Sequence, residues 1–304
     1  MSSSVQTTEA QKTGPVPMVV GLVRTARPKQ WVKNVLVLAA PFTAGRILDR
    51  GVLIAALLAF VAFSLCASAV YLVNDAIDVE ADRAHPKKRF RPIAAGIVPV
   101  PVAYVAAVLL AAAGLAVAFV TGWPLALLLA VYIAVQLGYC FGLKHQPVVD
   151  LCIVASGFLL RSMAGGLAAK IYLSQWFLLI TAFGSLLMVA GKRYAEIRLF
   201  EETGAEIRAS LRKYSSSYLR FVWATSAAVL IMSYGLWAFE LHQRTHSVWS
   251  VVSMVPFVVA VLRYAVDVDG GKAGAPDEIA LSDRVLQALG GIWFVAVSLA
   301  FYLS

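Results

Sequence analysis

Residues 52–92 read VLIAALLAFVAFSLCASAVYLV followed by NDAIDVEADRAHPKKRFRP. The first part is an apolar run of more than about 18 residues, which is long enough to cross a lipid bilayer as a helix. The second part, residues 74–92, passes directly from an acidic cluster into a basic one. The sequence therefore predicts a transmembrane helix that ends in a charged site at a membrane surface.

The same apolar pattern recurs along the chain. Of its 304 residues 60% are hydrophobic, against roughly half in soluble domains. Only helices and closed barrels satisfy their backbone in lipid, so we expect an all-α integral membrane protein, a bundle of about nine transmembrane helices. The predicted spans lie at about 34–50, 52–73, 98–120, 123–142, 147–168, 173–191, 216–238, 247–266 and 283–303.

Domain organisation and orientation follow from the polar segments. Residues 1–20 are polar and predict a disordered cytoplasmic tail, and residues 21–304 predict one transmembrane catalytic domain. Basic residues gather on the cytoplasmic side of membrane proteins, and this side receives most of the 26 in this chain. We therefore expect a multi-pass plasma-membrane protein whose charged motif faces the cytoplasm. Its predicted outer side keeps only Arg46, Arg50, Lys170 and Arg244.

The net charge of +9 does not indicate nucleic-acid binding. The basic residues are spread over membrane-proximal loops, and no nucleic-acid motif accompanies them. Anionic lipid headgroups and phosphorylated substrates are the expected partners.

Three aspartates carry the functional prediction. Asp75, Asp78 and Asp82 are spaced i, i+3 and i+7, so on a helix they share one face. Carboxylates on one face repel each other unless a cation lies among them, and Mg2+ takes oxygen ligands that it shares with substrate phosphates. We therefore expect a catalytic Mg2+–diphosphate site, in which Asn74 orients a carboxylate or a metal-bound water. The alternative is a solvated charged loop after a transmembrane helix.

The basic run after the aspartates predicts a phosphate-binding loop. Residues 83–91 hold five cations in nine positions, and prolines at 86 and 92 favour a structured loop over a continuous helix. Such a loop can close over an anionic substrate. Its candidate ligands are Arg83, Lys87, Lys88 and Arg91.

The N-terminal segment gives a second group of candidates. Lys29, Lys33 and Asn34 surround Trp31, a residue that suits the bilayer interface. They either bind a phosphate at the mouth of the bundle or anchor and orient the chain in the membrane.

Two further candidates lie between the fourth and fifth predicted spans, and one lies inside a span. Tyr139 and Lys144 belong to a short loop on the predicted inner side. Arg161 falls near the middle of the fifth span, where an arginine costs several kcal/mol unless it is paired or hydrated. We expect it to face a polar cavity, with either a phosphate or an aspartate as its partner.

The last group lies at the end of the sixth span. Lys192, Arg193 and Tyr194 are candidate substrate-binding residues, and Glu196 is a candidate second carboxylate for metal. Glu196 lies four residues after Lys192, so the alternative is that the two pair across one helical turn.

These motifs resemble the UbiA superfamily of intramembrane prenyltransferases over residues 22–303 or so. The pattern Asn74-Asp75-x-x-Asp78-x-x-x-Asp82 is similar to the superfamily's first Asp-rich motif. The second such motif is replaced here by Lys-Arg-Tyr-Ala-Glu at 192–196. This departure matches one branch, the actinobacterial decaprenyl-phosphate phosphoribosyltransferases. The features similar to that branch are Arg27-Pro28-x-Gln30-Trp31-x-Lys33-Asn34, His85-Pro86-x-Lys88-x-x-Arg91-Pro92, and Lys144 ahead of Asp150.

The resemblance implies a pentosyltransferase that uses Mg2+. Its donor would be 5-phosphoribosyl-1-diphosphate and its acceptor decaprenyl phosphate, giving decaprenylphosphoryl 5-phosphoribose for cell-wall arabinan, in arabinogalactan and lipoarabinomannan. It also makes a homo-oligomer, such as a trimer, plausible. The alternatives are an aromatic or quinone prenyltransferase that uses a prenyl diphosphate, and a transporter of a phosphorylated or lipid-linked solute.

Overall fold

A computed structural model describes residues 17–204, 211–270 and 282–302. In these residues the regular structure is helical, and eight stretches are long and apolar enough to cross a membrane. This confirms the predicted fold class and eight of the nine predicted spans. The spans are α3 (Arg50–Ile77), α5 (Val100–Thr121), α6 (Trp123–Cys140), α7 (Val149–Ala168), α8 (Gln175–Thr203), α9 (Ser216–Thr245), α10 with α11 (Val248–Val252 and Met254–Asp269) and α13 (Arg284–Tyr302).

The segment predicted as the first span is not one continuous helix. The chain runs through α1 (Met18–Ala26), a 3-10 helix η1 (Pro28–Leu38) and the short α2 (Ala39–Thr43). Arg27 breaks the helix between α1 and η1, with a φ of 54°. Proline at position 28 removes a backbone donor at the break, which favours the interruption. The predicted tail lies largely outside the described residues, and its last three residues, 18–20, belong to α1.

Side chains of α3 hold the interrupted segment in place. The indole of Trp31 donates to Ser68, which in turn donates to the carbonyl of Ala26, each over 3.0 Å. The amide of Asn34 donates to Ser64 over 2.9 Å. These bonds satisfy polar groups that lipid cannot solvate, so α3 fixes η1 against the bundle.

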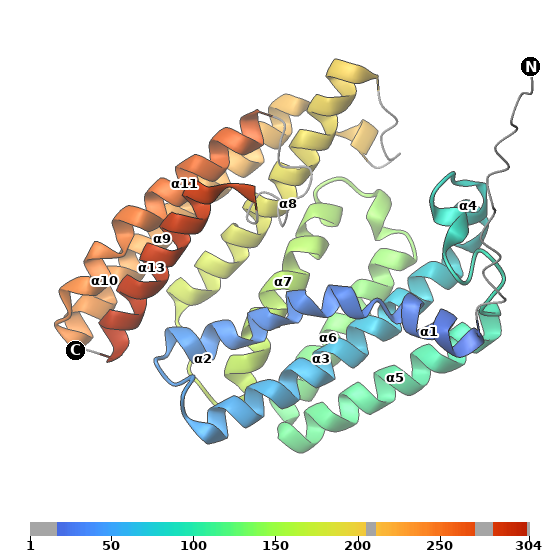
Figure 1. The fold of residues 1–304 in the computed structure, drawn as a ribbon, viewed down its shortest axis with the longest axis horizontal. Helices are drawn as coiled ribbons and strands as arrows, with labels where there is room; N and C mark the ends of the chain where they lie inside the picture. Colours follow the sequence, from blue (N-terminus) through green and yellow to red (C-terminus); the bar gives the residue numbers. More distant parts are fainter. Residues whose placement is uncertain (1–16, 205–210, 271–281, 303–304) are drawn as a thin grey trace, which may run out of the picture.

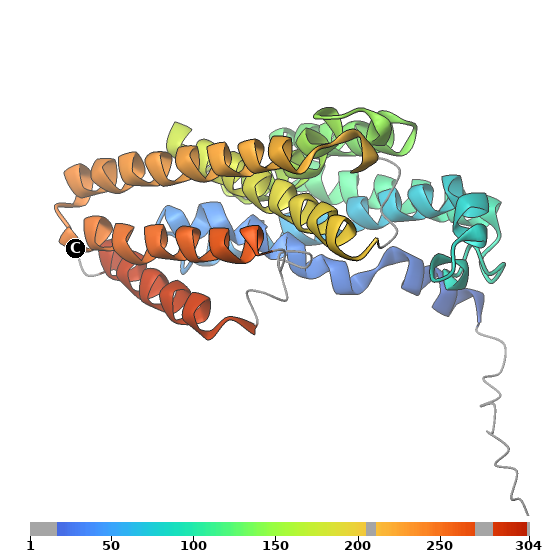
Figure 2. The ribbon, with the colours of Figure 1, turned by 90° about the horizontal axis from the view of Figure 1, so that it is seen from above.

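The helices form two groups that meet along α7 and α8 (Figures 1 and 2). The first group contains η1, α3, α5, α6 and α7, and the second contains α8, α9, α11 and α13. Each group has its own apolar core, one around Phe63 and Leu129 and the other around Tyr194 and Leu219. The helix α4 (Val79–Ala84), η3 (Leu143–His145) and η4 (Leu211–Lys213) lie at one end of the bundle (Figure 1).

The closest approach between α7 and η1 depends on a glycine. A Cβ placed on Gly165 would lie 1.7 Å from the carbonyl oxygen of Val37. We predict that Gly165→Ala pushes η1 away from α7 and lowers stability by about 3 kcal/mol. Thermal unfolding in detergent measures this as a lower Tm. Gly290→Ala on α13 is the control, because its Cβ would meet nothing within 4 Å. Equal Tm values for the two variants would contradict this account.

Candidate active site

The acidic motif spans the junction of two helices. Helix α3 ends at Ile77, Asp78 is the residue between the helices, and α4 begins at Val79. The spacing had predicted that the three aspartates share one face of a single helix. In the structure they lie instead on two helices and on the residue between them. Asp75 and Asp82 are each only 2% exposed, whereas the side chain of Asp78 is 27% exposed. The break separates one carboxylate from the other two.

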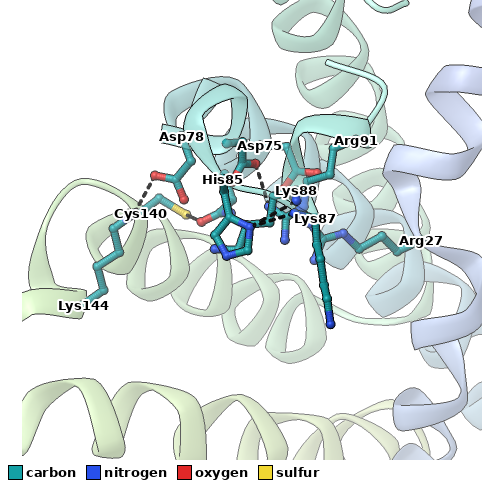
Figure 3. Close-up of polar contacts among 11 residues, drawn as sticks. Arg27, Asp75, Asp78, His85, Lys87, Lys88, Arg91, Cys140 and Lys144 are labelled. Atoms are coloured by element: carbon teal, nitrogen blue, oxygen red, sulfur yellow. Dashed lines mark hydrogen bonds and ion pairs between the residues drawn. The ribbon is translucent and has the colours of Figure 1, made fainter. Parts of the chain in front are cut away.

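One arginine joins the two buried carboxylates. A terminal nitrogen of Arg91 lies 3.1 Å from Asp75 and 2.8 Å from Asp82 (Figure 3). Arg27, from the break before η1, adds a second contact to Asp75 over 2.5 Å. Two basic side chains from separate segments thus neutralise two carboxylates that would otherwise repel each other. Sequence reasoning had not selected Arg27 as a site residue.

The third carboxylate has a different partner. Lys144 of η3 donates to Asp78 over 2.6 Å (Figure 3). The thiol of Cys140, at the end of α6, lies 3.5 Å from the side-chain oxygen of Asn74. The predicted residues Asn74, Asp75, Asp78, Arg91 and Lys144 therefore do gather at one place.

The arrangement suits a hard divalent cation in its donor chemistry. Within the described ranges, no group of three His, Cys, Asp or Glu side chains is close enough to hold a metal ion. However, Asp75 and Asp82 already share one positively charged group, so both can approach a single cation. Their oxygens are the ligands that Mg2+ prefers.

The basic loop is ordered, as its prolines predicted. The ring nitrogen Nδ1 of His85 accepts the amides of Lys87 and Lys88 over 3.1 and 3.3 Å. Arg83 donates to the carbonyl of Ala94 over 3.2 Å and pairs with Glu80, so its charge is already partly neutralised. The side chains of Lys87 and Lys88 are exposed beside the aspartates (Figure 3). They remain placed to meet an incoming anion.

Arg161 lies in the interior of the first helix group, 7% exposed. Its guanidinium donates to Asn34 over 2.8 Å, to the carbonyl of Gly157 over 2.6 Å and to Tyr132 over 3.3 Å. The ring of Phe63 lies 4.9 Å from it, which adds a cation–π contact. The partners of Arg161 in the structure are neutral oxygens and aromatic rings, not the aspartate that was one expectation.

The end of α8 does not present all of its candidates to the site. Arg193 is buried and pairs with Asp150 over 2.9 Å. Tyr194 is fully buried, and its hydroxyl contacts Arg220 and Asp269 of the second helix group. These positions favour structural roles for both residues over the predicted contact with substrate. Of the remaining candidates, Lys192, Glu196 and Tyr139 are half-buried, and Lys29 and Lys33 are exposed.

Tyr214 is a residue that sequence reasoning missed. It follows η4, and its hydroxyl donates to Asp150 and accepts the amide of Val148. Burial raises the pKa of its phenol, and the hydrogen bond to Asp150 acts in the same direction. The only sequence signal was an aromatic residue in a basic loop, which does not indicate a specific partner.

A cavity of about 490 Å³ lies between the two helix groups. Apolar side chains of α7, α8, α9, α11 and α13 dominate its lining, and Leu36 of η1 also lines it. Representative lining residues are Leu36, Phe158, Gly184, Leu230 and Leu286. The cavity is suited to an apolar chain.

The fold agrees with comparisons to known proteins. The chain belongs to the UbiA prenyltransferase family, whose model matches residues 35–280. The decaprenyl-phosphate phosphoribosyltransferase of Mycolicibacterium smegmatis is 56% identical over 318 residues, covering 100% of both chains. That of Mycobacterium tuberculosis is 59% identical over 293 residues, 94% of this chain and 96% of the relative. The predicted relation to this branch is therefore confirmed.

Solved structures support the same fold. A UbiA homolog from Archaeoglobus fulgidus bound to GPP and Mg2+ has a TM-score of 0.69 at 18% identity, over 93% of this chain and 100% of that one. A digeranylgeranylglyceryl phosphate synthase has a TM-score of 0.65 at 13% identity, over 94% and 99%. At these identities the likeness establishes the fold alone.

The position of Arg161 gives a test of its role. We predict that Arg161→Lys lowers stability by about 2 kcal/mol, because a lysine cannot make the three divergent contacts of the guanidinium. Thermal unfolding measures the loss. Arg46→Lys is the control, since Arg46 lies in an exposed pair with Asp49, of the kind that contributes little. An unchanged Tm combined with weaker substrate binding would instead place Arg161 in contact with substrate.

Proposed function

We propose that this protein transfers 5-phosphoribosyl from 5-phosphoribosyl-1-diphosphate to decaprenyl phosphate. The products are decaprenylphosphoryl 5-phosphoribose, a precursor for cell-wall arabinan, and diphosphate. The observation that carries the proposal is 56–59% identity, over nearly the whole chain, to relatives named for this transfer. The site supports it, because carboxylates and cations meet at the end of a membrane helix.

The donor is a polyanion, and the cations of the site are suited to hold it. Arg91 and Lys144 already contact the motif, and Lys87 and Lys88 are exposed beside it. When a diphosphate reaches the motif, its oxygens replace the protein carboxylates as the partners of these cations. We assign these four residues to phosphate groups of the substrates, with Lys29 at the mouth.

Asp75, Asp78 and Asp82 would hold Mg2+, with Asn74 supporting them. The bound ion would neutralise the departing diphosphate and orient it. Asp75 and Asp82 contribute by approaching one cation together, as they do around Arg91. The metal site and its residues are proposals that rest on this geometry and on oxygen-ligand chemistry.

The chemistry is substitution at the anomeric carbon of the ribose. The bond from this carbon to the diphosphate oxygen breaks, and a bond to an oxygen of the lipid phosphate forms. The attacking phosphate is already anionic near neutral pH, so no strong general base is required. The residues therefore act by positioning two anionic reactants and by stabilising charge.

The lipid acceptor would place its tail in the apolar cavity between the helix groups. Its phosphate would then lie at the end of the bundle that carries the charged loops, which we assign to the cytoplasmic side from the distribution of basic residues. The alternatives are less well supported. The named relatives do not favour transfer of a prenyl group to an aromatic acceptor, and they do not favour transport.

The first test removes the metal ligands. We predict that Asp75→Asn and Asp78→Asn each reduce transfer at least about 100-fold, because charge on the leaving group is no longer balanced. Membranes are incubated with radiolabelled phosphoribosyl diphosphate and decaprenyl phosphate, and lipid-extractable label is counted. EDTA should abolish the signal and Mg2+ should restore it.

Asp49→Asn is the matched control for this test, because Asp49 is an exposed aspartate that precedes α3, at the other end of that helix. The proposal fails if the unaltered protein forms no labelled lipid while a prenyl diphosphate and an aromatic acid react. It also fails if the motif variants retain activity.

The second test concerns the lipid tail. We predict that Gly184→Leu fills the cavity and raises KM for decaprenyl phosphate about tenfold, with a smaller effect on KM for the donor. A short-chain prenyl phosphate should be affected less. Gly290→Leu is the control, because it faces open space on α13. An equal effect on long and short acceptors would place the tail elsewhere.

A further inference from the structure

The loop that carries Lys144 contains a strained residue. Val148 has φ 68° and ψ −51°, and the amide of Val149 donates to the carbonyl of Pro147 over 2.8 Å. This is a γ-turn with positive φ, which is rare and strained. A β-branched residue with positive φ is a genuine outlier and persists only where the surroundings hold it.

Tyr214 supplies this restraint. Its hydroxyl accepts the amide of Val148 over 2.6 Å and donates to the carboxylate of Asp150. Asp150 is 1% exposed, and its other oxygen pairs with Arg193 of α8 over 2.9 Å. One buried hydroxyl therefore joins the strained turn to the first turn of α7, and α8 fixes the acceptor of its hydrogen bond.

A second contact comes from the preceding residue. The ammonium of Lys213 donates to the carbonyl of His145 over 2.7 Å. His145 directly follows Lys144, whose own ammonium lies 2.6 Å from Asp78. The pair Lys213–Tyr214 thus holds the Lys144 loop at two points, both within four residues of Lys144.

We propose that Tyr214, assisted by Lys213, is a positioning residue for the transfer reaction. It holds the strained turn at Val148 so that Lys144 stays against Asp78, where it meets a phosphate of the substrate. Tyr214 touches no reacting atom and acts through Lys144. This inference rests on the proposed function for its catalytic consequence, but the clamp itself is a property of the loop.

The first experiment needs no substrate. Amide hydrogen exchange of residues 143–149 is compared in the unaltered protein, Tyr214→Phe and Tyr218→Phe. The ring of Tyr218 stacks on that of Tyr214 with centroids 5.8 Å apart, so Tyr218→Phe is a matched loss of a phenol hydroxyl. We expect about tenfold faster exchange in Tyr214→Phe only, the factor for loss of one such hydrogen bond. Unchanged protection in Tyr214→Phe would overturn the clamp.

The second experiment tests whether the clamp acts through Lys144. Tyr214→Phe should raise KM for phosphoribosyl diphosphate about tenfold, with kcat changed less than about threefold. Calorimetry with Mg2+ present then gives the dissociation constant of the donor for Tyr214→Phe, Lys144→Ala and the double variant. We expect the second substitution to have no further effect once Lys144 is removed. Additive effects, or equal effects of Tyr218→Phe, would overturn the proposal.

The two experiments separate this inference from the function on which it rests. If the unaltered protein forms no labelled lipid, the proposed function fails, while the exchange comparison still tests the clamp. If the unaltered protein is active but Tyr214→Phe exchanges and binds like Tyr218→Phe, only the positioning role fails.

Discussion

The structure depends on the neutralisation of three carboxylates at a membrane surface. Asp75, Asp78 and Asp82 lie within eight residues of chain, and two of them are almost completely buried. Burial of an unpaired charge costs more than a small domain can offset. The cations that neutralise them come from three separate segments: the break before η1, the loop between α4 and α5, and η3. Ion pairing at the motif therefore fixes three connections of the bundle at once.

The interrupted first helix follows from this requirement and from a second buried charge. Arg27 follows the end of α1 and itself has a positive φ. Its side chain contacts Asp75. Further along the same segment, Asn34 accepts from Arg161 and donates to Ser64. The segment therefore makes polar contacts to both α3 and α7.

The sequence was sufficient to predict the fold class. Apolar runs long enough to cross the bilayer core can form only helices or closed barrels there. The sequence also selected acidic and basic residues that the structure brings into contact, since they abut in one motif. It did not predict that residues 34–50 pass from η1 through the short α2 into turns. Hydropathy measures how apolar a segment is. It does not show where the backbone of that segment accepts hydrogen bonds from a neighbouring helix.

The sequence also did not show which residues pair with each other over long distances along the chain. Arg193 was selected as a phosphate ligand because it is basic and ends a span, yet its partner is Asp150, 43 residues earlier in the chain. Tyr194 was selected with it and lies in the apolar core. Local charge predicts that a residue needs a partner, and only the packing of α7 against α8 decides which partner it finds.

This packing gives a physical meaning to the changed second motif. At the place where the resemblance leads us to expect a second Asp-rich motif, this chain has a cation, Arg193, that pairs with Asp150. Asp150 in turn accepts from Tyr214, whose hydroxyl holds the turn behind Lys144. The second helix group is thus connected to the acidic motif through a positioned lysine. The changed motif therefore anchors Asp150 by an ion pair, and Lys144, not Arg193, is the cation that our proposal places at a phosphate, since each added phosphate requires positive charge close to it.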